Sequence, residues 1–137
     1  MKNINLIMGS TIKRMLTSNA GVVGLVGDRI YMDLAPGAAA RPYVLFAWAG
    51  GGFDNMAPGN GFDVMYTVTG VSGDMAEASK LAEYIAQALL GTPPDFPDGV
   101  SFNAPVTGTD VFHDSQNVQN VYFWRDGMVY RFRGMIR

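Results

Sequence analysis

Cysteine is absent from the sequence, which excludes disulfides and thiolate metal sites. Histidine is nearly absent as well: His113 stands alone, so a metal site there would lack a second imidazole ligand. Charged residues make up 16% of the chain, against roughly 25% in typical soluble domains, which suggests that another molecule covers part of the surface. The formal net charge of −2 argues against a general nucleic-acid binder, because such proteins carry a basic excess.

Long apolar runs are also missing. No stretch approaches the roughly 18 consecutive apolar residues that a membrane span requires. Polar residues interrupt the first 16 positions every two or three residues, so they do not form the apolar core of a secretory signal. We therefore expect a soluble, unprocessed chain. Its 137 residues fit one domain, 1–137, with a real hydrophobic core.

The motifs of common enzyme classes do not occur. The sequence has no G-x-x-x-x-G-K-[ST] phosphate loop and no G-x-S-x-G nucleophile motif. Gly21, Gly24 and Gly27 loosely match a dinucleotide fingerprint, but a helical pattern precedes them and a strand follows, which is the reverse of the required order. His113 lies in what reads as a connection between strands and is interpreted as a solvated loop residue. We predict no catalytic residue, no metal site and no cofactor.

Hydrophobic periodicity predicts the main elements. An apolar stripe at helical spacing over 74–90, capped by Ser72 or Asp74 and stopped by Gly91, predicts the clearest helix. The other expected elements are a helix over 4–16, a helical turn over 20–26, and strands over 27–31, 43–49, 62–71, 100–106 and 111–112, followed by a hairpin. This order predicts an α+β fold with a mainly antiparallel sheet, helices packed on one face, and an extended β-hairpin loop.

The closing hairpin is predicted to turn at Asp126-Gly127, because Asp-Gly is a strong hairpin signal. That register pairs Arg125 with Met128. It places Val121, Phe123, Tyr130 and Phe132 on one face, and Tyr122, Trp124, Val129, Arg131 and Arg133 on the other. The second face has three open interpretations: a subunit interface, exposed cross-strand pairs, or a stacking platform for single-stranded nucleic acid. The acidic chain disfavours the last.

The glycine-rich stretch GGGFDNMAPGNG at 50–61 is predicted to be a long hairpin loop. Its glycines lack the lysine and hydroxyl partners of a phosphate site. Asp54, Asn55 and Asn60 of the loop, with Asp63 just after it, do not follow calcium-loop spacing. The loop carries Phe53 and Met56, which are unfavourable in water, so we expect a neighbouring molecule to order it. The alternative is a loop without a partner.

Several segments carry a resemblance to a known family. They are GLVGDRIY at 24–31, PYVLF at 42–46, EASKLAEYIAQALL at 77–90, and the closing aromatic–basic strand. In order and length the chain resembles the tail-completion or tail-terminator proteins of long-tailed phages and related particles. The resemblance implies a non-enzymatic virion protein at the head-proximal end of the tail, assembled in the host cytoplasm.

The resemblance also implies partners. Family members form a ring, usually a hexamer, that caps the tail tube, stops its polymerisation and joins the head connector, while DNA passes through without being read. The candidate oligomer or tube interface comprises Phe53, Asp54, Met56, Tyr122, Trp124, Arg131 and Arg133. Two alternatives remain open: another head–tail joining component, or a small-molecule-binding or enzymatic α+β domain with its site near His113.

Overall fold

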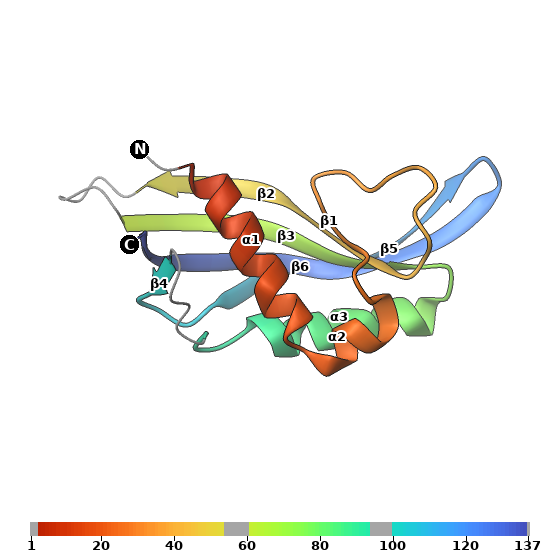
Figure 1. Cartoon of the computed structure of the whole chain (residues 1–137). Coiled ribbons are helices and arrows are strands. Elements are labelled where there is room, and N and C mark those ends of the chain that lie inside the picture. Colours follow the sequence, from red (N-terminus) through yellow and green to blue (C-terminus); the bar gives the residue numbers. More distant parts are fainter. Residues whose placement is uncertain (1–2, 54–60, 94–99, 137) are drawn as a thin grey trace.

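The computed structural model describes residues 3–53, 61–93 and 100–136. The chain order of its elements is shown in Figure 1. The helices are α1 (Ile4–Thr17), α2 (Ala20–Val26) and α3 (Met75–Leu89). The strands are β1 (Ile30–Met32), β2 (Tyr43–Phe53), β3 (Gly61–Ser72), β4 (Val100–Phe102), β5 (Thr107–Val118) and β6 (Val121–Ile136).

The strands form one six-stranded sheet in the order β1-β2-β3-β6-β4, with β5 also paired to β6. The β1–β2 pair is parallel, and the other pairs are antiparallel. All three helices lie on one side of the sheet (Figure 1). The predicted α+β fold, with a mainly antiparallel sheet and helices on one face, is confirmed.

Side-chain caps define where the helices begin. Asn3 Oδ1 accepts hydrogen bonds from two backbone amides at the start of α1, and Asn19 Oδ1 accepts one from Val22 in α2. Asp74 caps α3 as predicted, and its side chain accepts from the amide of Ala76. Because each cap satisfies amides that have no partner within the helix, it fixes the helix boundary locally.

The core lies between the helices and the even-numbered positions of the central strands. Tyr66 and Tyr130 are among its largest fully buried side chains, and the Tyr66 hydroxyl donates a 2.6 Å hydrogen bond to Asn5 of α1. The other buried core residues on the sheet include Val44, Phe46, Phe62, Val64, Val68, Phe132 and Ile136. Alternation along β3 and β6 therefore leaves the odd-numbered positions on the face without helices.

The predicted hairpin turn at Asp126-Gly127 is wrong. β6 runs unbroken through both residues, and Asp126 and Gly127 pair with Gly70 and Thr69 of β3. The actual turn is Gln119-Asn120, whose φ angles of 52° and 65° are those of a two-residue primed turn. β5 accordingly covers Thr107–Val118 instead of only 111–112.

Close packing of strands explains the glycine at position 127. A side-chain carbon there would collide with the Val68 carbonyl oxygen and with the backbone of Thr69. Glycine inside a strand often marks such a close backbone approach. Asp126-Gly127, which reads as a turn in the sequence, is therefore part of a long strand, and close packing requires the glycine.

The correction changes which side chains share a face. Along one continuous strand, even and odd positions point to opposite sides. Tyr122 and Trp124 thus point to the helix side, whereas Arg131 and Arg133 point to the other side. Phe123 likewise points to the side opposite the core residues Tyr130 and Phe132. The predicted shared aromatic–arginine face does not exist.

The glycine-rich stretch is partly strand. Gly50, Gly51 and Gly52 belong to β2, with an irregularity in pairing between Trp48 and Gly50. Gly51 has a φ of 94° and lies against the backbone of Asp63 and Val64. The remainder, 54–60, lies outside the described residues, so the structure does not test the prediction that a neighbouring molecule orders this loop. Four other strands differ in extent from their predictions: β1 is Ile30–Met32, β2 runs on to Phe53, β3 is one residue longer at each end, and β4 ends at Phe102.

Candidate interaction surface

The face of the sheet opposite the helices is left uncovered by them; we call it the open face. It is formed by β2, β3, β6 and β5. Their odd-numbered positions point away from the helices, except in β2 beyond Trp48 and in β5 beyond Thr109, where a shift of one residue makes the even-numbered positions do so. A bulge there, at Asp110 with a φ of 53°, shifts the register by one residue. The partly exposed apolar side chains of the open face are Leu45, Ala47, Met65, Phe112 and Val129.

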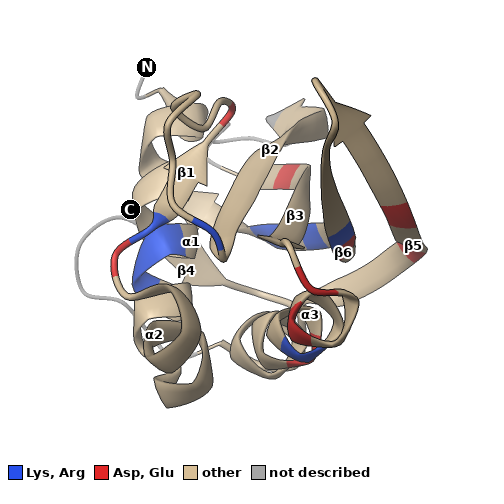
Figure 2. Cartoon of the chain, turned by 90° about the vertical axis from the view of Figure 1, so that its right-hand side faces the viewer, with Lys and Arg blue, Asp and Glu red and all other residues tan. Residues whose placement is uncertain are grey.

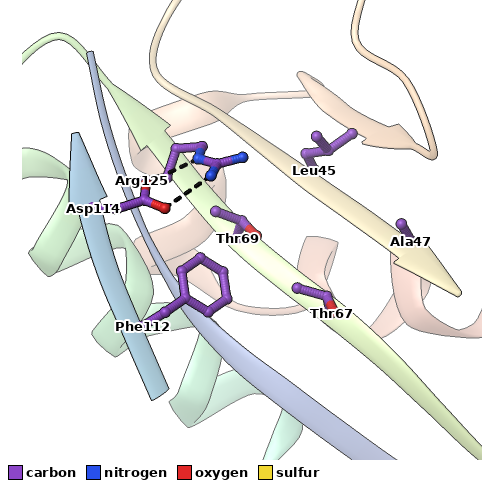
Figure 3. A pocket seen from close by; sticks show the side chains of 7 residues that line it. All are labelled: Leu45, Ala47, Thr67, Thr69, Phe112, Asp114 and Arg125. Carbon is purple, nitrogen blue, oxygen red and sulfur yellow. Dashed lines mark hydrogen bonds and ion pairs between the residues drawn. The ribbon is translucent and has the colours of Figure 1, made fainter. Parts of the chain in front are cut away.

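A hollow of about 380 Å³ lies on the open face (Figure 3). It is lined by Leu45, Ala47, Thr67, Thr69, Phe112, Asp114 and Arg125. Gly127 sits between Thr69 on β3 and Phe112 on β5 in the pairing register. Because Gly127 has no side chain, β6 contributes no side chain between Thr69 and Phe112, and the open face is recessed there.

The charges that line the hollow are paired with one another. Arg125 donates from Nε and Nη2 to the two carboxylate oxygens of Asp114, at 3.0 and 2.8 Å. These hydrogen bonds hold the pKa of the Asp114 carboxyl below its ordinary value and raise the pKa of Arg125. A charged group inside the hollow therefore meets a neutral pair.

The same arrangement recurs further along the open face. Arg131 donates from Nε to Asp63 at 2.8 Å, and its Nη2 contacts the second oxygen. The hydrogen bonds from Arg131 lower the pKa of Asp63. In Figure 2 the acidic positions of β3 and β5 flank the basic positions of β6. The middle of this face thus carries bidentate ion pairs, which fix the arginines in place.

The β5–β6 hairpin extends beyond the rest of the sheet (Figure 1). The last β3–β6 pair is Ser72 with Trp124, so beyond this pair β5 and β6 pair only with one another. The residues from 115 to 124 read SQNVQNVYFW and include no charged side chain. Val118, Val121 and Tyr122 near the turn are 53%, 48% and 67% exposed. We call this uncharged end, 117–122, the hairpin tip.

A polar cluster anchors the base of the hairpin to α3. Asp126 is 7% exposed, and its carboxylate accepts hydrogen bonds from Ser79 Oγ on α3, at 2.6 Å, and from His113 Nδ1 on β5. The His113 ring stacks on Trp124, with centroids 5.5 Å apart. His113 is therefore a strand residue with a structural contact, and its interpretation as a loop histidine is wrong.

This cluster lacks the arrangement of a nucleophilic site. Ser79 and His113 both bind the carboxylate instead of one another, so His113 is not placed to take the serine proton. Within the described ranges, no group of three or more His, Cys, Asp or Glu side chains is placed to hold a metal ion. Among the described helices none is long and apolar enough to cross a membrane.

The predicted interface residues fall in different places. Tyr122 is exposed at the hairpin tip, Trp124 is partly buried at its base, and Arg131 and Arg133 are exposed on the open face. The backbone of Phe53 ends β2, while Asp54 and Met56 lie outside the described residues.

Sequence reasoning missed the tip valines and the hollow. The available signal for the turn was Asn120, a residue type that tolerates a positive φ. The stretch TDVFHDSQNV at 109–118 has no apolar alternation that would mark it as a strand.

Comparison with known proteins shows to which family the chain belongs. The model of the family described as tail completion protein gp17 matches residues 11–125. A chain in the solved structure titled "Virion of native gene transfer agent (GTA) particle" aligns with a TM-score of 0.64 at 19% identity, covering 90% of this chain and 91% of that chain. At this identity the likeness concerns the fold. No curated protein matches. The predicted family resemblance is confirmed: the chain belongs to the tail completion protein gp17 family and has a structural role in a virion tail.

Proposed function

We propose that the protein is a tail terminator. In this role copies of the chain form a closed ring, a hexamer, that caps the tail tube, stops its polymerisation and joins the tail to the head connector. The ring sits at the head-proximal end of the tail and assembles in the host cytoplasm. DNA passes through its channel without sequence-specific binding, and the protein catalyses no reaction.

The observation that carries the proposal is the family match over residues 11–125. The distribution of exposed apolar side chains supports it. Leu6, near the start of α1, is 71% exposed, and the hairpin tip exposes Val118, Val121 and Tyr122. The start of α1 and the hairpin lie at opposite ends of the molecule in Figure 1. Two different apolar surfaces on one subunit suit contacts with two different neighbours, and contacts between unlike surfaces of identical copies make a ring when the rotation closes.

A closed ring also explains capping in physical terms. A tube grows because each ring presents the next ring with the same surface. A terminator has one face that matches the last tube ring and a second face that does not, so growth ends where it binds. The sparse charge of the chain, 16% of residues, fits a subunit with much of its surface buried between neighbours.

The test is assembly. The purified protein at micromolar concentration should sediment as a ring, and imaging of tails assembled with it should show sixfold density at one end of tubes of uniform length. A strictly monomeric protein that is absent from purified tails would refute the proposal. A ring that binds the connector but leaves tube length uncontrolled would assign it instead to another head–tail joining component.

The remaining alternative, a small-molecule or enzymatic site near His113, is separated by His113→Ala. The terminator proposal predicts that this variant still caps tails, because the side chain acts only at the hairpin base. Loss of capping in a variant that folds and forms rings would favour the alternative.

A further inference from the structure

We propose that the hairpin tip of one copy seats in the open-face hollow of the next copy, with Val118 and Val121 against the hollow. The inference rests on the proposed ring, since it needs copies of the chain to associate. It assigns the two surfaces that make the contact, and it names the occupant of the hollow: an uncharged segment of an identical chain.

The tip valines are placed to enter a recess. Val118 and Val121 pair with one another at the last position before the turn, and both lie on the open-face side of the hairpin. Each is about half exposed. An adjacent valine pair at the end of a projecting hairpin is an apolar surface that gains by leaving water.

The chemistry of the hollow suits this occupant. Leu45, Ala47 and Phe112 supply apolar contact, and Thr67 and Thr69 supply hydroxyl groups. The charges of Asp114 and Arg125 already neutralise one another within the subunit. A charged segment that entered the hollow would lose its water without meeting an opposite charge that is still unpaired, which is unfavourable. The tip brings no charge, because the segment 115–124 has none.

A chain cannot fill its own hollow. Phe112 of the hollow and Val118 of the tip lie on the same strand, β5, six residues apart. At about 3.3 Å per residue, the tip stands roughly 20 Å from that phenylalanine. β5 and β6 are paired continuously from Phe112 to the turn, so the hairpin cannot fold back. The occupant is therefore a tip from another copy.

The contact has the symmetry of a ring. Each subunit offers one tip and one hollow, and the two are different surfaces, so every contact leaves another tip and another hollow free until the ring closes. A symmetric contact between two tips would also bury the valines, but assembly would then stop at a dimer.

Cysteine crosslinking tests the pairing directly, because the chain contains no cysteine. We would prepare Val121→Cys and Ala47→Cys separately, with tags of different mass, mix them and oxidise. The expected result is a covalent heterodimer that forms only in the mixture. Crosslinking of Val121→Cys with itself at equal or higher yield, or no heterodimer from a mixture that forms rings, would overturn the proposal.

A charge placed on either face of the tip gives a second test. Val121→Asp puts a carboxylate toward the hollow, whereas Asn117→Asp puts the same charge on the opposite face of the hairpin, where Asn117 pairs with Tyr122. Val121→Asp should raise the concentration at which rings form by roughly tenfold or more, since a central contact is lost. The Asn117→Asp control should leave it within about threefold. Both sites are exposed, and circular dichroism checks the fold of each variant.

The outcomes separate this inference from the proposed function. If the unsubstituted protein forms rings and caps tails but Val121→Asp assembles equally well, the tip–hollow contact is wrong and the terminator role stands. If the unsubstituted protein neither forms rings nor enters tails, the proposed function itself fails.

Discussion

Replacing Gly127 by alanine tests whether close packing against β3, and not a turn, requires the glycine at this position. A methyl group at this position would meet the Val68 carbonyl oxygen and the Thr69 backbone of β3. Both are strand backbone, so neither can rotate away as a flexible side chain could. The strands must separate or shift, and overpacking of this kind typically costs about 1–3 kcal/mol of the free energy of unfolding. A domain of this size should lose roughly 3–6 °C in melting temperature for each kcal/mol.

The matched control is Gly73→Ala, just before α3. A methyl group there meets no atom within 4 Å. This substitution should be neutral or should stabilise by up to about 1 kcal/mol through the unfolded chain. Urea unfolding of both variants at the same protein concentration measures the difference. A Gly127→Ala variant as stable as Gly73→Ala would refute the argument that close strand packing requires the glycine.

Three further substitutions give expected outcomes. Tyr66→Phe removes the hydroxyl that donates to Asn5 and should cost about 1 kcal/mol of unfolding free energy; a double-mutant cycle with Asn5→Ala should show that the two losses are not additive. Asp114→Asn should cost less than about 1 kcal/mol at pH 7, because the pair is partly exposed. Folding lowers the pKa of Asp114. The contribution of its carboxylate to the free energy of unfolding should therefore be complete at pH values above the ordinary pKa of about 3.9 and should fade as the pH falls through the lowered pKa; urea unfolding at pH 7 and pH 3 measures this. Asn19→Ala should cost about 1 kcal/mol and Asn19→Ser much less, in thermal melts, because serine keeps a capping oxygen for α2.

The helices and the central hairpin could be predicted because their signals are local. The stripe of α3 includes Leu81 and Ile85, both fully buried, and Asp74 and Gly91 mark its ends within a few residues. Alternation from Phe62 to Val68 likewise reports one buried face of β3. Such patterns depend only on neighbours along the chain.

The β5–β6 region could not be predicted in the same way because it is decided by contacts far apart in sequence. Gly127 is a glycine because of β3, which is more than fifty residues earlier in the chain, and no local pattern distinguishes that need from a turn. The true turn uses Gln119, which seldom adopts a positive φ. One wrong turn then assigned Tyr122 and the arginines to a common face, whereas in the structure they point to opposite sides of the sheet.

The position of β6 in the chain has a consequence for how the protein is made. β6 pairs with β3 on one edge and with β4 and β5 on the other, yet it is made after all three of these strands. Until it arrives, the long edge of β3 has no partner and the helices have only part of a sheet to cover. Completion of the sheet must therefore wait until β6 has been made and rely on long-range pairing, which is slow. The nascent chain meanwhile presents a bare strand edge open to mispairing.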